Sequence, residues 1–372
     1  MDHEDILPEI LVRLSPRPSS LLGASLVCKR WSRLLADPYF LRRLRAHHRW
    51  EIPLLGFFTD EFGFLHFTPL LEPPDRIPSE RLSMGTYHDE GWRFHECRHG
   101  IALLLNRKLM ELAVWDPVTG EKCRLAVPPG FNGPESRVTV RAAALLCDDS
   151  KQAFSVVVLR HDEIPKDDKP LVFTSVYESK TGIWGNLISA PITSPLWLGK
   201  PSILVGNSLC WWLRGYGDSG ILEFDLERQS LVVIDTPVDT HANPYSSFQI
   251  LRMEDDSLGL AILSDVSIQL WERKANSGGF AKWMLHKTIE LDKLLSLLAE
   301  STWLVIQGYD EDGNWIFVWT NIGIFMIQLE SMQFRNLFKT HFVNNYHPYT
   351  NFYTAGSRIG GGSIEAEALN ST

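Results

Sequence analysis

Cysteine is scarce in this chain and shows no metal-binding or redox spacing. Only five of the 372 residues are cysteine, namely Cys28, Cys97, Cys123, Cys147 and Cys210. They are scattered, odd in number and contain no Cys-x-x-Cys pair, which argues against a disulfide framework and against a zinc ribbon. We therefore expect a protein of a reducing compartment, the cytoplasm or the nucleus.

Long apolar runs are missing as well. No stretch approaches the roughly 20 apolar residues that a membrane-spanning helix needs. The first ten residues, MDHEDILPEI, are acidic and lack the basic flank and apolar run of a signal peptide. We expect neither a membrane partner nor a secretory leader.

Catalytic motifs are also lacking. The chain contains no Gly-x-Ser-x-Gly motif, and no nucleophile can be paired with a base from the sequence. The segment GYGDSG (215–220) matches Gly-x-Gly-x-x-Gly, but it stands between two strand patterns instead of between a strand and a helix. It predicts a hairpin loop. We expect no enzyme, no catalytic residues and no cofactor.

Three further segments are interpreted as structural. His95, Cys97 and His99 alternate and would share one face of a strand, but no fourth ligand stands at a convincing distance, so we expect no metal site. DEDGNW (310–315) begins like a calcium loop, lacks the Glu of the twelfth position, and predicts a hairpin turn. LRHDEIPKDDKP (159–170) is interpreted as a solvated loop, with contact to a partner as the alternative.

Charge is spread unevenly along the chain. The net charge is −9, yet residues 1–50 carry nine basic and five acidic side chains. The run LRRLRAHHR could indicate a DNA-binding helix pair or a nuclear localisation signal. Because the remaining chain is acidic and would repel phosphates, we expect no nucleic-acid partner.

The first fifty residues predict three short helices. In EDILPEILVRL the apolar residues recur at one-turn spacing, with Asp5 as N-cap and Ser15-Pro16 as the stop. Apolar residues at helical spacing over 24–35 predict one second amphipathic helix, which Ser19 and Ser20 could cap. Asp37-Pro38 combines a cap with a proline at the first helical position, and so opens a third helix.

The third helix is expected to turn its apolar residues inward and its arginines outward into solvent. The inward residues are Phe40, Leu41 and Leu44, and the outward residues are Arg42, Arg43 and Arg45. A helical unit this small rarely stays folded without a partner surface or a neighbouring domain. It also has more large apolar residues than one small core can hide, so we expect a surface for another protein.

The segment LPEILVRL…SLVCKRWSRLLADPYFLRRL resembles an F-box. The matching elements are Leu7-Pro8, the apolar stripe that follows, the Val-Cys-Lys-Arg-Trp run and Asp37-Pro38, although Gly23 stands where many relatives have a bulkier apolar residue. The resemblance implies docking onto a Skp-type adaptor and, through it, a cullin. It also implies nine adaptor-facing or adaptor-supporting positions: Leu7, Pro8, Ile10, Leu11, Leu14, Leu26, Val27, Cys28 and Trp31.

From Glu51 onward, strand patterns dominate and form an imperfect repeat. An aromatic residue followed by an acid precedes a turn at Trp115-Asp116, Tyr177-Glu178, Phe224-Asp225 and Trp271-Glu272, at spacings of 62, 47 and 47 residues. Each unit predicts two strands joined by a turn and is preceded by another apolar strand. A multi-strand repeat of about 40–60 residues is the signature of a β-propeller, because blades bury their faces only against one another.

We count about six degenerate blades between residues 51 and 355, with a helix in 289–301 inserted between two of them. The phrases VWDPVTG…VPP, CRHGIALLLNR and NFYTAG resemble the F-box-associated, propeller-like domains of plant F-box families. That resemblance implies a domain that binds a target protein.

Together these features predict an α+β multidomain chain. A small three-helix F-box (1–48) precedes an all-β, propeller-like substrate-binding domain (49–355) and a disordered tail (356–372). The predicted function is substrate recognition in an SCF-type cullin E3 ubiquitin ligase. The alternative is a propeller with enzymatic or glycan-binding activity and a structural helical cap. A scaffold acting outside a ligase is a third possibility.

Overall fold

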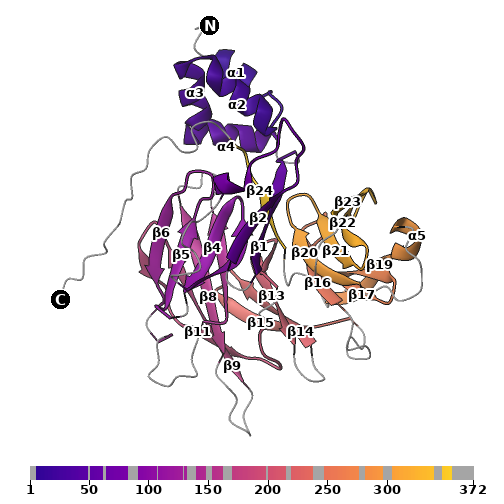
Figure 1. The fold of residues 1–372 in the computed structure, drawn as a ribbon. Coiled ribbons are helices and arrows are strands. Elements are labelled where there is room, and N and C mark those ends of the chain that lie inside the picture. Colours follow the sequence, from indigo (N-terminus) through magenta and orange to yellow (C-terminus); the bar gives the residue numbers. More distant parts are fainter. Residues whose placement is uncertain are drawn as a thin grey trace, which may run out of the picture.

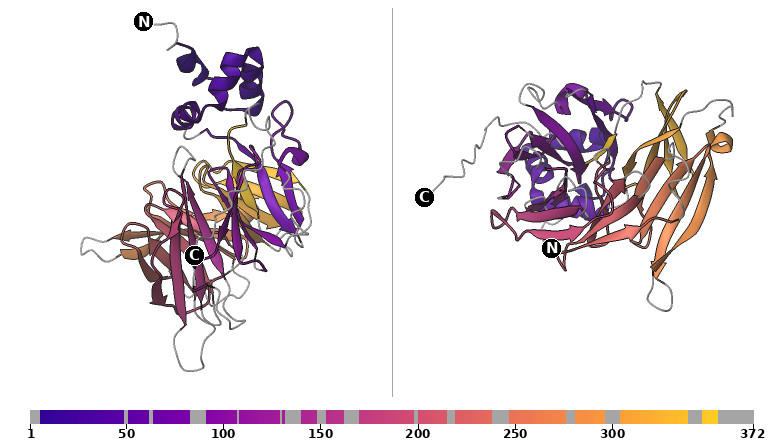
Figure 2. Two further views of the ribbon diagram at one scale, coloured as in Figure 1. Left: turned by 90° about the vertical axis from the view of Figure 1, so that its left-hand side faces the viewer. Right: turned by 90° about the horizontal axis from the view of Figure 1, so that it is seen from below.

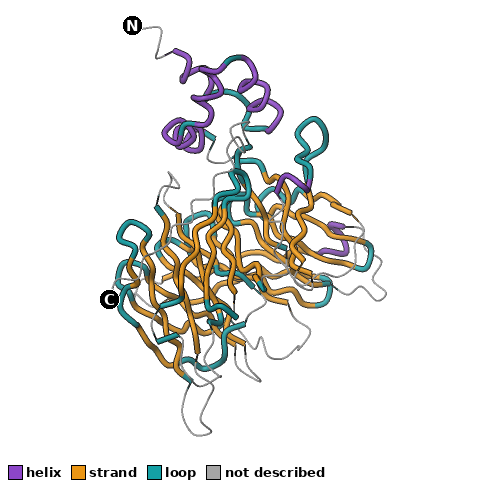
Figure 3. The backbone as a smooth tube through the Cα atoms, turned by 60° about the vertical axis from the view of Figure 1, so that its left-hand side comes forward, coloured by secondary structure: helices purple, strands orange, loops and turns teal. Residues whose placement is uncertain are grey.

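The chain folds into a small helical domain and a larger ring of β-sheets, as a computed structural model describes it (Figure 1). Figures 2 and 3 show the N-terminal helices gathered at one end of the molecule, with the strands filling most of the rest. The structure describes residues 6–48, 51–61, 64–82, 91–106, 108–128, 130–131, 140–147, 153–161, 170–197, 200–214, 219–237, 247–275, 281–295, 304–338 and 346–353. Asp5 and the predicted tail (356–372) therefore lie outside the described residues.

Four short helices, not three, make up the helical domain. The second predicted helix is broken at Cys28, whose extended backbone (φ −164°, ψ 166°) ends one helix and begins the next. Because the apolar residues on both sides of the break keep a helical spacing, the sequence pattern concealed it. The helices are α1 (Ile6–Leu11), α2 (Pro18–Val27), α3 (Lys29–Ala36) and α4 (Pro38–His47).

The predicted cap of the last helix is confirmed. Oδ1 of Asp37 accepts a hydrogen bond of 2.9 Å from the backbone N–H of Phe40, and Pro38 occupies the first turn of α4. The apolar stripes of the four helices meet in one core. Its fully buried members include Leu11, Leu21, Leu35, Phe40 and Leu44.

The strands in the described part of the chain form six sheets arranged as the blades of a propeller. This confirms the predicted fold and the predicted blade number. Each of blades two to six is a meander in which the first strand is innermost, and the inner strands of most neighbouring blades touch. A short 3-10 turn, η1 (Ser79–Leu82), lies between the first and second blades.

The first blade is built from both ends of the propeller sequence. β1 (Leu54–Glu61) pairs on one side with β2 (Phe64–Pro69) and on the other with β24 (His347–Thr350). β24 also contacts β3 and β20, the inner strands of the second and last blades. Pairing of the last strand with the first therefore closes the ring.

The second, third and fourth blades follow in chain order. Blade two contains β3 (Trp92–Arg98), β4 (Ile101–Asn106), β5 (Glu111–Trp115) and β6 (Lys122–Ala126). Blade three contains β7 (Ala142–Cys147), β8 (Phe154–His161), β9 (Leu171–Glu178), β10 (Ile183–Trp184) and β11 (Ile188–Pro191). Blade four contains β12 (Ile203–Val205), β13 (Ser208–Arg214), β14 (Ser219–Asp225) and β15 (Ser230–Asp235).

The fifth and sixth blades complete the ring. Blade five contains β16 (Ser247–Arg252), β17 (Leu258–Ser264), β18 (Ser267–Ala275) and β19 (Ala281–Glu290), and is followed by helix α5 (Leu291–Leu295). Blade six contains β20 (Val305–Asp310), β21 (Trp315–Thr320), β22 (Gly323–Gln328) and β23 (Phe334–Phe338). The helix predicted within 289–301 is therefore present from Leu291, and its part beyond 295 lies outside the described residues.

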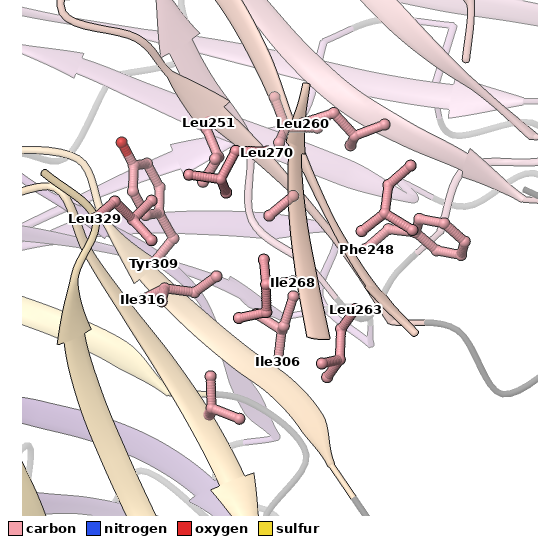
Figure 4. Close-up of a cluster of buried hydrophobic side chains, with 14 of the residues drawn as sticks. Phe248, Leu251, Leu260, Leu263, Ile268, Leu270, Ile306, Tyr309, Ile316 and Leu329 are labelled. Atoms are coloured by element: carbon pink, nitrogen blue, oxygen red, sulfur yellow. The ribbon is translucent and has the colours of Figure 1, made fainter. Parts of the chain in front are cut away.

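The repeated aromatic-acid pairs all fall on the third strand of a blade. Trp115, Tyr177 and Phe224 lie at or next to the ends of β5, β9 and β14, whereas Trp271 lies inside the longer β18. Aliphatic and aromatic side chains then fill the space between blades. Figure 4 shows one such layer, in which Leu251, Ile268 and Leu270 of blade five lie beside Ile306, Tyr309 and Ile316 of blade six.

Candidate functional site

Helix α1 and the last turn of α2 carry exposed apolar side chains. Leu26 is 80% exposed and Val27 61% exposed, both in the last turn of α2, and Ile6 and Ile10 of α1 are each 50% exposed. Leu26 and Val27 lie outside the buried face of α2, which is made by Pro18, Leu21, Ala24 and Ser25. We call Ile6, Ile10, Leu26 and Val27 the apolar edge.

The nine residues implied by the F-box resemblance divide into two groups. Four are exposed, and the other five are partly or fully buried. Exposed are Ile10, Leu26 and Val27 of the apolar edge, together with Cys28 at the break. Leu11 is fully buried, Leu7, Leu14 and Trp31 pack against the same core, and Pro8 is half-buried.

The N-terminus of α2 is capped by a residue of the propeller. Ser19 and Ser20 were expected to cap this helix, but no side chain next to it does so. Instead, Oδ1 of Asp75, which follows the first blade hairpin, accepts a hydrogen bond of 3.0 Å from the backbone N–H of Ser19, and Oδ2 lies 3.2 Å from Nη1 of Arg17. Although burial opposes it, these hydrogen bonds hold the pKa of Asp75 below its ordinary value.

Helix α4 forms the second contact with the propeller. Arg45 was expected to point into solvent, but Nη2 donates to Oδ1 of Asn351 at 3.2 Å and the guanidinium lies 5.7 Å from the ring centre of Phe352. Phe352, directly after β24, is itself buried in the helical core. Burial lowers the pKa of Arg45, with Asp312 opposing the shift. The strand that closes the ring thus also holds the helical domain.

A buried ion-pair network lies at the inner ends of the blades on the side of the helical domain. Arg98, at the end of β3, is 2.9 Å from Oε1 of Glu311 and 3.2 Å from Oε1 of Glu96. It also donates to the carbonyl oxygens of Leu145 in β7 and Ser202 before β12, both at 2.9 Å. Although burial opposes it, Glu311 and Glu96 hold the pKa of Arg98 above its ordinary value. One side chain therefore joins four blades.

The sequence pattern drew attention to this region through His95, Cys97 and His99, whereas its charged network is formed by Glu96 and Arg98. The β3 register shifts between Phe94 and Glu96, which interrupts the expected alternation of His95, Cys97 and His99. Cys97 packs against the core of its blade and His99 occupies a turn with φ of 50°. No group of metal-ligating side chains suited to an ion is found in the described part of the chain. The opposite charges of Glu96 and Arg98 on one apolar strand were the signal that could have found the network.

The remaining candidate segments are hairpins or lie outside the described residues. β13 and β14 pair directly across GYGDSG, whose residues 215–218 are not described, so the segment joins two strands and does not precede a helix. β20 and β21 likewise pair across 310–315, and the N–H of Gly313 donates to Oδ2 of Asp310 at 3.1 Å, as a hairpin turn requires. Most of the charged segment 159–170 is outside the described residues.

None of the helices in the described ranges has the length and apolar character needed to cross a bilayer. All five cysteines are free thiols.

Two family models match the sequence. The model described as "F-box protein AT5G49610-like, beta-propeller" matches residues 93–354, and the model "F-box-like" matches residues 4–47. The chain is also 24% identical over 304 residues to F-box protein At5g03970 of Arabidopsis thaliana, an alignment that spans 77% of this chain and 68% of that protein. Both matches agree with the division into helices and blades.

Two solved structures show a distant likeness to the fold. A chain of the nidogen/laminin complex has a TM-score of 0.43 at 9% identity, and covers 78% of this chain and 95% of its own. The periplasmic gluconolactonase of Pseudomonas aeruginosa has a TM-score of 0.42 at 11% identity, with 76% and 80% covered. Likenesses at this level carry no argument about function.

Proposed function

The chain belongs to the family of F-box proteins with an AT5G49610-like β-propeller, and from this premise we propose that it is the target-binding subunit of an SCF-type ubiquitin ligase. The helical domain docks onto a Skp-type adaptor and thereby onto a cullin. The propeller holds a target protein. The chain performs no chemistry itself, and acts by keeping the target close to a ubiquitin-charged enzyme.

The observation that carries this proposal is the exposure of Leu26 and Val27 at the end of α2. Each such side chain gains about 1.5–3 kcal/mol when it is fully buried. Because both side chains stay exposed in the chain alone, this stabilising free energy is gained only when a partner covers them. Both residues belong to the segment that the F-box model matches.

The buried part of the predicted site has a supporting role in this proposal. Leu11 is inaccessible, and Leu7, Leu14 and Trp31 pack beneath the helices that bear the apolar edge. These residues hold the backbone of α1 and α2 in place, while Ile10, Leu26 and Val27 contact the adaptor. We propose the cytoplasm or nucleus as the location, because all five cysteines are free thiols, as in reducing compartments.

Co-purification of the full chain with a Skp-type adaptor tests the proposal. The double substitution Leu26→Glu with Val27→Glu should weaken adaptor binding at least about thirtyfold, because it removes a central apolar contact of about 2 kcal/mol or more. A matched control is Leu109→Glu with Val232→Glu, since these residues are 58% and 53% exposed on the propeller. Equal adaptor binding by the two double variants would contradict the proposed docking surface.

The recruitment of a cullin is tested in the same preparation. The proposal requires that cullin be retained whenever the adaptor is retained. Adaptor binding without cullin would indicate a scaffold that acts outside a ligase. Loss of both from the apolar-edge variant, with both retained by the control, is the expected result.

The alternative of an enzymatic or glycan-binding propeller has one observation in its favour, a convergence of carboxylates at one end of the ring. Glu96, Asp310, Glu311 and Asp312 line the same pocket. Two of them, Glu96 and Glu311, are paired with Arg98. The pocket volume of about 40 Å³ is far below the roughly 300–1,000 Å³ of small-molecule sites. A sugar or a comparable substrate does not fit, so we favour protein recognition.

A further inference from the structure

A small pocket lies on the axis of the propeller at the end that faces the helical domain. Its walls come from the end of β3, the turn between β20 and β21, and β24. Its position relative to the helices is set by His99, a wall residue whose carbonyl oxygen accepts from Nη1 of Arg45 at 3.5 Å. The volume of about 40 Å³ gives room for about three water-sized groups.

The pocket has more negative than positive charge. Among the described residues that line it, four carboxylates share the one guanidinium of Arg98. Three more cations lie nearby, but each donates to a backbone carbonyl oxygen: Arg45 to His99 at 3.5 Å, Lys200 to Ile306 at 2.6 Å and Arg252 to Glu311 at 3.0 Å. Among the described residues that line the pocket, neither Asp310 nor Asp312 forms an ion pair with a cation, although the charge of Asp312 acts on Arg45 outside the wall.

The pKa of Asp310 reflects this excess of negative charge. Its carboxylate accepts hydrogen bonds from the N–H of Gly313 at 3.1 Å and from Oγ1 of Thr350 at 3.3 Å, both neutral donors. Burial, followed by the nearby charge of Asp312, raises the pKa of Asp310 to about 7. A positive group placed between the two aspartates would oppose that shift by favouring the charged form of both carboxyls.

Two buried nitrogen atoms of the pocket wall also lack a hydrogen-bond partner. They are Nδ1 of His347, a residue 6% exposed, and Nε of Arg98, a residue 7% exposed. Burial lowers the pKa of His347 to about 3, so its imidazole is neutral near pH 7. A buried polar atom without a partner costs about 1–3 kcal/mol, and such atoms in a polar cavity are normally satisfied by a bound group.

We propose that this axial pocket receives a cationic group of the target protein, either the ammonium or guanidinium of a Lys or Arg side chain or a free N-terminal ammonium. The aspartates pair with the cation. Nε of Arg98 can donate to a carbonyl oxygen that accompanies it, and Nδ1 of His347 can accept from it. The inference rests on the proposed target-binding role of the propeller and assigns the chemistry of one contact.

Small probes of each source test the inference on the full chain. Acetyl-arginine amide and acetyl-lysine amide represent side chains, and glycylglycine amide represents a free N-terminus. Acetyl-citrulline amide and acetyl-glycine amide are the neutral counterparts. Saturation-transfer NMR and titration should show binding of at least one cationic probe about tenfold or more tighter than its neutral counterpart.

Asp312→Asn removes one charge from the pocket without breaking a side-chain hydrogen bond to another described residue, and should weaken the cationic probe about tenfold. The matched control is Asp265→Asn, in the turn between β17 and β18, where φ is 52° and Asn is equally tolerated. Arg252, which donates to Glu311 in the pocket wall, pairs with Leu258 at the start of β17, whereas Ser247 pairs with Leu263 near its end. The turn after β17 therefore lies at the end of the blade that is away from the pocket. Probe binding should not change in the control.

Preference for the acetylated amino-acid amides assigns the pocket to side chains, and preference for glycylglycine amide assigns it to an N-terminus. Either result supports the inference. Equal binding of cationic and neutral probes, or an affinity that Asp312→Asn leaves unchanged, would overturn it. Thermal unfolding confirms that the variant is folded, and Asp310→Asn, which keeps an acceptor for Gly313, is the second variant if it is not. Adaptor co-purification involves a different surface, so either proposal can fail alone.

Discussion

The guanidinium of Arg45 in α4 donates a hydrogen bond of 3.2 Å to Oδ1 of Asn351, which lies 306 residues further along the chain. Asn351 follows directly on β24, the strand that closes the propeller ring. One contact therefore connects the first domain of the chain to the last strand of the second. The orientation of the helical domain depends on the closed ring.

The first prediction concerns this contact. Arg45→Ala should lower the free energy of unfolding by about 2 kcal/mol, because it removes a charge-assisted hydrogen bond and the cation–π contact with Phe352. Urea denaturation of the full chain measures the change. Arg42→Ala, on the same helix but exposed, loses a surface cation–π contact in which the guanidinium lies 5.3 Å from the ring centre of Tyr39, and should cost no more than about 1 kcal/mol. A double-mutant cycle with Asn351→Ala should show coupling, and additive effects would count against a direct interaction.

The second prediction concerns the buried network at the axis. Arg98→Met should cost about 3–5 kcal/mol, because it leaves Glu96, a residue 2% exposed, without its counter-charge. Arg93→Met on the same strand should cost no more than about 1 kcal/mol, since Arg93 pairs with Asp60 at the surface. Adding Glu96→Gln to Arg98→Met should restore part of the stability. Chemical denaturation of the four proteins checks the order, and similar losses for Arg98 and Arg93 would refute it.

The third prediction concerns closure of the ring. Tyr349 of β24 is fully buried, with its ring centre 5.3 Å from that of Phe58 and 6.0 Å from that of Phe67. Tyr349→Ala should therefore cost about 3–5 kcal/mol, as for other large aromatic truncations. Tyr39→Ala is the matched control, since Tyr39 is 63% exposed on α4, and it should cost less than about 1 kcal/mol. Thermal unfolding distinguishes the two, and a stable Tyr349→Ala variant would show that β24 is dispensable.

The fourth prediction concerns pH. Burial, with the nearby charges of His95 and Lys200, lowers the pKa of His347 to about 3 from 6.5. Below pH 6.5 only the unfolded chain takes up this proton, so the free energy of unfolding falls as the pH is lowered. Between pH 7 and pH 5 the natural chain should lose about 2 kcal/mol more stability than His347→Gln. Denaturation at several pH values measures the difference, and parallel profiles would contradict the assigned shift.

Much of the fold could be predicted because its signals are local. The aromatic-acid pair recurs on the third strand of four of the six blades, since these strands meet similar surroundings. The cap at Asp37 lies three residues from the N–H group that it satisfies. The F-box resemblance likewise depends on closely spaced residues. Each of these features is encoded within one helix or one blade.

The features missed from the sequence depend on partners far along the chain. The cap of α2 comes from Asp75, and Arg45 points inward because Asn351 and Phe352 are there to receive it. The break at Cys28 was missed because both of its flanks keep helical spacing. The sequence neighbours of Asp75, Arg45 and Cys28 give no indication of these arrangements.

The sequence by itself determined the elements of this protein, because hydrophobic periodicity and caps act over a few residues: a helical F-box unit, about six degenerate blades and the order in which they follow. Tertiary structure alone decided what those elements bring together. The closed ring placed Arg98 against Glu311, and Asp310 and Asp312 beside His347, in a pocket beside α4. The physical reason is that burial and charge pairing depend on distance in space, which a ring of blades sets independently of distance along the chain.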